Sequence, residues 1–209
     1  MALGTYTELQ ASIADWLDRT DLTSVIPDFI ALFEANANTE AAIRTLFNRT
    51  STSIPTVANQ NYISTPTDFL APESYIYTSS GNKQVVSPYG TSAALYAAFP
   101  STTGGPPKGL ISLNGKLELA PVPDSAYTGT LYYYSKIPAL ASNSTNWLLT
   151  NYPQVYLFGS LLAAEAYLQN DPRLPVWGSM YDNAIQKLQG STDRNKYAGP
   201  VSVKFDAVV

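Results

Sequence analysis

Residues 155–168, the longest apolar stretch of the chain, read Val-Tyr-Leu-Phe-Gly-Ser-Leu-Leu-Ala-Ala-Glu-Ala-Tyr-Leu. Helical spacing places five of its side chains on one stripe: Tyr156, Leu157, Leu161, Ala164 and Leu168. Such a stripe predicts a helix with one face directed at a core. Gly159, Ser160 and Glu165 interrupt the stretch, which is therefore too short and too polar to span a bilayer.

Helical signals continue on both sides of this stretch. Asn146 or Thr150 is a candidate N-cap, and Pro153 suits a first turn. Asp171-Pro172 breaks the chain, and a second stripe follows: Leu174, Trp177, Tyr181, Ile185 and Leu188. Residues 145–189 are therefore predicted to be helical, with a break at residues 171–172.

The N-terminal residues predict a second helical pair. Thr5 and Glu8 have the spacing of a capping box. An apolar face follows: Leu9, Ile13, Trp16 and Leu17. Thr23 or Ser24 is the expected cap of the next helix, which has Pro27 in its first turn and is predicted to extend to about Ile43. The two helical pairs must pack on each other to bury their apolar faces.

Residues 44–144 have strand and turn signals instead. Residues 111–119 alternate apolar and polar around Asn114-Gly115, the strongest local signal for a hairpin. Further strands are expected at residues 62–63, 75–77, 84–86 and 128–137, and a short helix at residues 90–98. The prediction is an α+β protein: a helical bundle from residues 1–43 and 145–189, with a β-rich insertion at 44–144.

The last residues, 190–209, are predicted to form an extended C-terminal arm. Near its end, Val201, Val203 and Phe205 alternate with Ser202 and Lys204. This alternation is typical of a strand that completes its pairing on another molecule.

The composition excludes several classes of enzyme. The chain has 209 residues and contains neither histidine nor cysteine, so it has no disulfide, no thiolate zinc site and no Ser-His-Asp triad. Only 13% of the residues are charged, against about 25% in an ordinary soluble domain. A surface with so few charges can be covered by protein neighbours at low desolvation cost. The net charge of −4 argues against tight nucleic-acid binding.

Acidic residues offer two weaker alternatives. Asp15, Asp18 and Asp21 could be imagined as calcium ligands, but the Gly-containing calcium loop is missing, so a solvated helix face is the preferred interpretation. Glu118 and Asp124 could form a glycosidase pair, as in a cell-wall hydrolase, although acids near a hairpin are common. We therefore expect no enzymatic activity, no cofactor and no metal.

Tyrosines and lysines leave a binding function open. Tyr132, Tyr133 and Tyr134 present rings to both faces of one predicted strand, where they can form core, contact a protein or stack on a sugar. Three lysines of the insertion could form a weak patch for DNA or sugar: Lys83, Lys108 and Lys116. The preferred interpretation is that they are exposed loop lysines that prevent edge-to-edge strand pairing. A carbohydrate- or receptor-binding tail module is thus the alternative function, although such modules lack flanking helical pairs.

Three pairs of stretches resemble one known family. They are Thr5-Tyr-Thr-Glu-Leu-Gln-Ala-Ser-Ile-Ala-Asp-Trp-Leu with Ile26-Pro-Asp-Phe-Ile-Ala-Leu, Leu113-Asn-Gly-Lys-Leu-Glu-Leu-Ala-Pro-Val-Pro with Leu131-Tyr-Tyr-Tyr-Ser-Lys-Ile-Pro, and Tyr156-Leu-Phe-Gly-Ser-Leu-Leu with Asp171-Pro-Arg-Leu. In this order they resemble the head-to-tail adaptor (connector) proteins of tailed bacteriophages.

The resemblance implies a structural component of the virion neck, made in the host cytoplasm. A ring, usually of twelve copies, would bind the portal protein and the tail or nozzle protein, and DNA would pass through its lumen without sequence-specific binding. No membrane partner is expected.

Two sets of residues are the predicted contact sites. The arm would bind the portal or a neighbouring subunit through Val201, Val203, Lys204 and Phe205. Gly- and Pro-rich loops of the insertion would contact the tail side through Asn59, Tyr62, Thr102 and Pro106.

Overall fold

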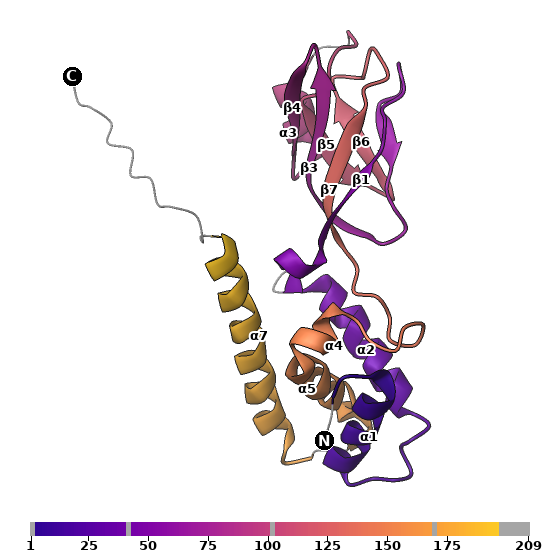
Figure 1. Cartoon of the computed structure of the whole chain (residues 1–209), viewed down its shortest axis with the longest axis vertical. Coiled ribbons are helices and arrows are strands. Elements are labelled where there is room, and N and C mark those ends of the chain that lie inside the picture. Colours follow the sequence, from indigo (N-terminus) through magenta and orange to yellow (C-terminus); the bar gives the residue numbers. More distant parts are fainter. Residues whose placement is uncertain (1–2, 41–42, 101–102, 169–170, 197–209) are drawn as a thin grey trace, which may run out of the picture. The chain divides into compact units, whose positions relative to one another are not determined.

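The structure, a computed structural model, describes residues 3–40, 43–100, 103–168 and 171–196. It divides into two compact units, one formed by residues 1–47 with 137–209 and the other by residues 48–136. We call them the helical unit and the β unit (Figure 1). The predicted α+β class is confirmed.

The helical unit is built around one buried helix. Its helices are α1 (Tyr6–Leu17), α2 (Ile26–Thr39), α4 (Trp147–Asn151), α5 (Pro153–Ala163), α6 (Glu165–Leu168) and α7 (Leu174–Lys196). Every residue of α5 from Val155 to Leu161 is buried, and α5 packs against α1, α2, α4 and α7. Figure 1 shows α5 between α7 and α2. The first half of the longest apolar stretch, residues 155–161, is thus the centre of this core.

A glycine lets α2 approach α5 closely. A Cβ atom at Gly159 would lie 2.2 Å from the Phe33 ring, far inside van der Waals contact. The Phe33 ring also packs edge-on against Tyr156, with ring centroids 5.0 Å apart. The close packing of Phe33 on α5 therefore requires glycine at position 159.

Local sequence signals explain the N-termini of α1 and α4. Thr5 and Glu8 form the predicted capping box, and the Asn146 side chain accepts a hydrogen bond from Leu149 N–H as the N-cap of α4. The cap predicted at Thr23 or Ser24 is wrong: Val25 precedes α2, and the Thr23 hydroxyl donates instead to the Thr20 carbonyl.

Two predicted helix boundaries also need correction. Helix α2 ends at Thr39 rather than near Ile43, because Glu40 has an extended conformation. Helix α7 continues past Gly190 to Lys196, so any extended arm begins after that residue. Its predicted contact residues lie outside the described residues: Val201, Val203, Lys204 and Phe205.

The β unit contains one curled sheet whose described strands follow the order β1-β7-β3-β4-β5-β6-β2. The strands are β1 (Arg49–Ser53), β2 (Tyr62–Ser64), β3 (Phe69–Ser79), β4 (Asn82–Pro88), β5 (Gly109–Leu113), β6 (Lys116–Ala120) and β7 (Gly129–Ser135). Neighbours are antiparallel except β4 and β5, which are parallel and joined through helix α3 (Ser92–Ala98). The predicted hairpin is β5–β6, with positive φ at both Asn114 and Gly115.

Strand β1 was not predicted, since its sequence Arg-Thr-Ser-Thr-Ser lacks apolar alternation. It pairs with β7 at one edge of the sheet, while β2 occupies the other edge. Only residues 54–61 separate β1 from β2 along the chain. Because so short a segment joins both edges, the sheet must curl to bring them within reach.

Candidate functional site

The predicted contact loops of the β unit are held by one common segment. Asn59 N–H donates to the Pro123 carbonyl, and Gly105 N–H donates to the Val122 carbonyl, both at 2.8 Å. We call residues 57–61, 103–107 and 121–127 the loop cluster. The structure thus brings the loops of Asn59 and Pro106 together, although 47 positions separate these residues in sequence (106 − 59).

The backbone explains how this loop cluster is positioned. Asn59 adopts a left-handed conformation with φ of 62°, which asparagine tolerates better than most residues. The buried Tyr77 hydroxyl donates to the Pro107 carbonyl at 3.1 Å, fixing the second loop to β3. Thr102 lies outside the described residues.

Tyr62 lies in a strand rather than in a loop. It forms part of β2 opposite Glu118, and Lys116 Nζ lies 4.0 Å from the centroid of its ring. This cation–π contact covers one face of the half-buried ring. Tyr62 therefore supports the sheet edge beside the loop cluster.

The exposed part of the loop cluster carries little charge. Val57 is 52% exposed, and Pro106, Ser125 and Ala126 are also exposed. The Asp124 carboxylate accepts a hydrogen bond from the Tyr127 hydroxyl at 2.6 Å. This bond to the carboxylate is the main cause of the raised pKa of Tyr127. Such a surface suits contacts with another protein through apolar groups and backbone atoms.

Glu118, proposed above as one of a catalytic pair, also has a structural role. Its carboxylate accepts hydrogen bonds from Asn61 Nδ2 at 2.9 Å and from the Tyr96 hydroxyl at 2.5 Å. The bond to Glu118 raises the pKa of Tyr96. Among the residues that the structure describes, no three or more acidic side chains gather as a possible metal site.

Three tyrosines belong to the buried core of the β unit, Tyr75, Tyr77 and Tyr133, and two further aromatic residues pack against it. Tyr75 is fully buried, its hydroxyl donates to the Ile54 carbonyl at 2.7 Å, and burial raises its pKa to about 12. Tyr133 is buried and donates to Asp68 at 2.9 Å, and burial raises its pKa to about 12 as well. Tyr132 and Tyr134, on the opposite strand face, are half-buried. The buried tyrosines of the β unit therefore stabilise its fold.

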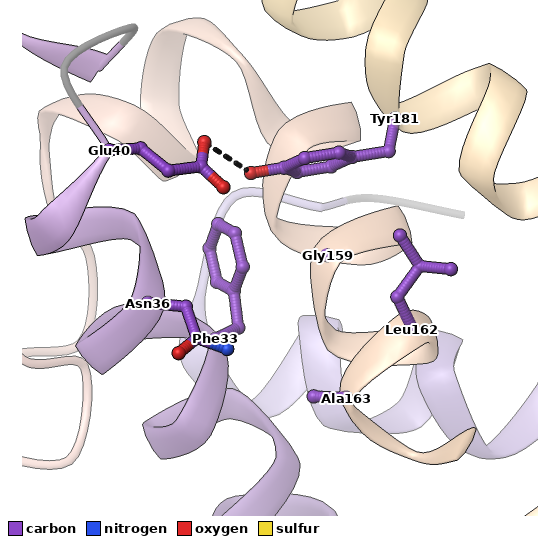
Figure 2. Close-up of a pocket in the computed structure, with 7 residues that line it drawn as sticks. All are labelled: Phe33, Asn36, Glu40, Gly159, Leu162, Ala163 and Tyr181. Atoms are coloured by element: carbon purple, nitrogen blue, oxygen red, sulfur yellow. Dashed lines mark hydrogen bonds between the residues drawn. The ribbon is translucent and has the colours of Figure 1, made fainter.

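The helical unit carries a small pocket that sequence reasoning did not identify. The pocket has a volume of about 180 Å³. Figure 2 shows it between α2, α5 and α7, lined by Phe33, Asn36, Glu40, Gly159, Leu162, Ala163 and Tyr181. The Tyr181 hydroxyl donates to the Glu40 carboxylate at 3.0 Å and thereby ties α7 to the end of α2. Burial and the neighbouring carboxylate raise the pKa of Tyr181.

A buried carboxyl group on α2 holds the residues at the start of the C-terminal helical segment. Glu34, only 8% exposed, accepts hydrogen bonds from Leu140 N–H at 2.9 Å and from the Tyr156 hydroxyl at 3.0 Å. Asn146 donates to the same Tyr156 hydroxyl. Burial raises the pKa of the Glu34 carboxyl, because the charged form loses its hydration.

Arg173 explains why the Asp171-Pro-Arg-Leu motif matters. Its guanidinium donates to the Trp16 carbonyl at 2.9 Å and to the Leu17 carbonyl at 3.3 Å, at the end of α1. It also pairs with Asp171 and lies over the Trp177 ring. One side chain therefore caps α1 and anchors the start of α7.

Comparisons with known proteins add the family. None of the described helices has the length and apolarity needed to span a membrane. The family model described as SU10 adaptor protein matches residues 4–204 and thus runs through both units. No curated protein matches the chain.

Proposed function

The chain belongs to the SU10 adaptor protein family. Because this family implies a component of the phage virion, we propose that the chain forms the ring of the virion neck that joins the portal to the tail or nozzle. The observation that carries the proposal is the family match over residues 4–204, which includes both compact units. Two units with separate cores suit a protein that must contact two different partners.

The charge of the chain agrees with DNA passage through such a ring. A net charge of −4 with only 13% charged residues argues against tight retention of DNA. DNA would therefore slide through the proposed lumen rather than bind to it. A ring of twelve copies is the expected assembly.

A phage that lacks the gene provides the direct test. We expect it to produce DNA-filled heads without tails, as seen by negative-stain electron microscopy, and purified protein added to these heads should restore tail attachment. If infectious, tailed particles form without the protein, the neck function is wrong. Binding to host-surface glycans by the isolated protein would support the tail-module alternative instead.

We place the tail-side contact on the loop cluster. Its support is the convergence of the loops of Asn59 and Pro106 on a weakly charged surface. Pro107 is left unsubstituted, because it is buried and its carbonyl accepts a hydrogen bond from the Tyr77 hydroxyl. Val57→Asp and Pro106→Asp should therefore lower tail attachment while portal binding persists, and Leu113→Asp on the β5–β6 hairpin is the matched control. Equal loss of both activities would contradict this assignment.

We place the portal contact on the arm, for which the alternation of Val201, Val203 and Phe205 is the support. The end of α7 belongs to the core, since Thr192 is buried and Ser191 bonds to Tyr152. Truncation after Lys196 should therefore leave the melting temperature unchanged and weaken binding to purified portal. Undiminished portal binding would refute this role of the arm.

A further inference from the structure

Helix α2 exposes an apolar surface beside α6. Leu32 is 54% exposed and Tyr167 is 51% exposed. They border a hollow of about 450 Å³, and the fully buried Phe29 meets Tyr167 edge-on with centroids 5.1 Å apart. Exposed Asp28 supplies the charge of this surface. We call this surface, formed by Asp28, Phe29, Ala31, Leu32 and Tyr167, the α2 face.

A second apolar surface runs between α5 and α7. Its floor is Phe158, and Met180, 38% exposed, stands on its wall. The hollow measures about 390 Å³, and Lys187 supplies its charge. We call it the α5/α7 groove, formed by Gln154, Phe158, Met180, Asn183, Ala184 and Lys187.

The pattern of α7 shows that this groove is a second face of the helix. Trp177, Ala184 and Leu188 form its buried side. A different stripe is exposed at helical spacing: Val176, Met180, Asn183 and Lys187. Val176, 53% exposed, extends the apolar surface by one turn beyond Met180. Exposed apolar side chains grouped in this way mark a protein contact.

We propose that the α2 face of one copy packs into the α5/α7 groove of the next copy, with Leu32 and Tyr167 against Phe158 and Met180, and with Asp28 beside Lys187. This inference rests on the proposed ring and names its subunit contact. The two surfaces share no residue and belong to one hydrophobic core, so each copy offers both partners of the contact at a fixed spacing. Repetition of such a heterologous contact can close a ring.

Charge favours this pairing over pairing of either surface with itself. Contact between two α2 faces would bring two Asp28 carboxylates together, and contact between two grooves would bring two Lys187 ammonium groups together. Like charges facing each other at an interface oppose association, whereas Asp28 and Lys187 attract. The predicted occupant of each surface is therefore the other surface of a second copy.

The absence of cysteine from the chain makes a clean cross-linking test possible. Leu32→Cys and Met180→Cys are made separately in the full chain, mixed at high protein concentration and treated with a short bismaleimide. The mixture should give about tenfold more cross-linked dimer than either variant alone, as expected if the heterologous contact is favoured by about 1.4 kcal/mol. The double variant should give a ladder of higher multimers.

A surface control and a charge exchange complete the experiment. Val85→Cys, at a 59% exposed apolar residue of β4, replaces either partner as the control. Asp28→Lys or Lys187→Asp should each lower the yield, and both together should restore it. A mixture no better than the Val85→Cys control, equal self-linking of either variant, or failed restoration would overturn the proposed contact.

The outcomes also separate this contact from the neck function. Heterologous cross-linking with normal tailed particles in the gene-deletion phage would leave the contact valid and refute the neck function. Untailed heads in the gene-deletion phage without heterologous cross-linking would retain the neck function and require a different subunit contact.

Discussion

At the scale of single residues, the helical core depends on one missing methyl group. Gly159→Ala places a Cβ atom 2.2 Å from the Phe33 ring, which also packs edge-on against Tyr156 of α5 and Tyr181 of α7. We expect the free energy of unfolding to fall by about 1–3 kcal/mol, measured by urea denaturation. Gly178→Ala is the matched control, since nothing lies within 4 Å of its added Cβ, and it should raise stability by about 0.4–1 kcal/mol.

A double-mutant cycle identifies the clash as the cause. Phe33→Leu replaces the ring that the new methyl group meets with a shorter side chain. The loss of unfolding free energy caused by Phe33→Leu should therefore be smaller in the Gly159→Ala background than in the wild type. Additive losses would show that the cost of Gly159→Ala arises elsewhere.

The buried Glu34 carboxyl gives a second prediction at this scale. Its pKa is raised above the ordinary 4.5, so the folded state holds a proton that the unfolded state releases. Its contribution to stability is therefore complete below pH 4.5 and is lost as the pH rises through the pKa of the folded protein. Each unit of pKa elevation corresponds to about 1.4 kcal/mol.

Glu34→Gln tests this directly because it cannot ionise and keeps an acceptor for Leu140 N–H and the Tyr156 hydroxyl. The stability of the variant relative to the wild type should rise between about pH 4 and about pH 8, in denaturation series at each pH. A difference that stays constant, or that falls with rising pH, would contradict a raised pKa.

At the scale of elements, Arg173 connects the end of α1 to the start of α7. Arg173→Ala should lower the free energy of unfolding by about 1–2 kcal/mol, because two backbone carbonyls of α1 lose their donor. Arg19→Ala is the control: Arg19 also pairs with an aspartate two positions away, Asp21, but that pair is exposed, and its loss should cost less than about 0.5 kcal/mol. Equal effects in a thermal denaturation series would show that the carbonyl bonds of Arg173 do not matter.

At the scale of the whole molecule, the β unit has its own core. Its buried residues form a cluster separate from that of the helical unit: Ile63, Tyr75, Tyr77, Val86, Leu110, Leu117, Leu119, Leu131 and Tyr133. We expect residues 48–136, expressed alone, to unfold cooperatively on heating and to give dispersed amide signals in NMR spectra. A fragment without a thermal transition would mean that the β unit needs the helical unit to fold.

Short-range interactions explain what the sequence by itself determined. The capping box of Thr5 and Glu8, the Asn146 cap and the Asn114-Gly115 hairpin all join residues within a few positions, and the structure contains each of them. The apolar stripe of α7 likewise follows from helical periodicity. The single stripe predicted for residues 156–168 is wrong: α5 is buried on every side from Val155 to Leu161, and Leu168 lies in the separate helix α6. The resemblance to phage adaptors rested on such local stretches and is confirmed by the family match.

Only the tertiary structure decided the features that join distant residues. Strand β1 lacks an apolar pattern and exists because β7 supplies its hydrogen bonds. The Glu34 contact with Leu140, the Arg173 contact with α1 and the Asn59 contact with Pro123 all cross more than 40 positions of sequence. Local patterns indicate which side chains are buried, but not which residues cover them. The partner of each buried side chain depends on how all the elements pack together in one dense core.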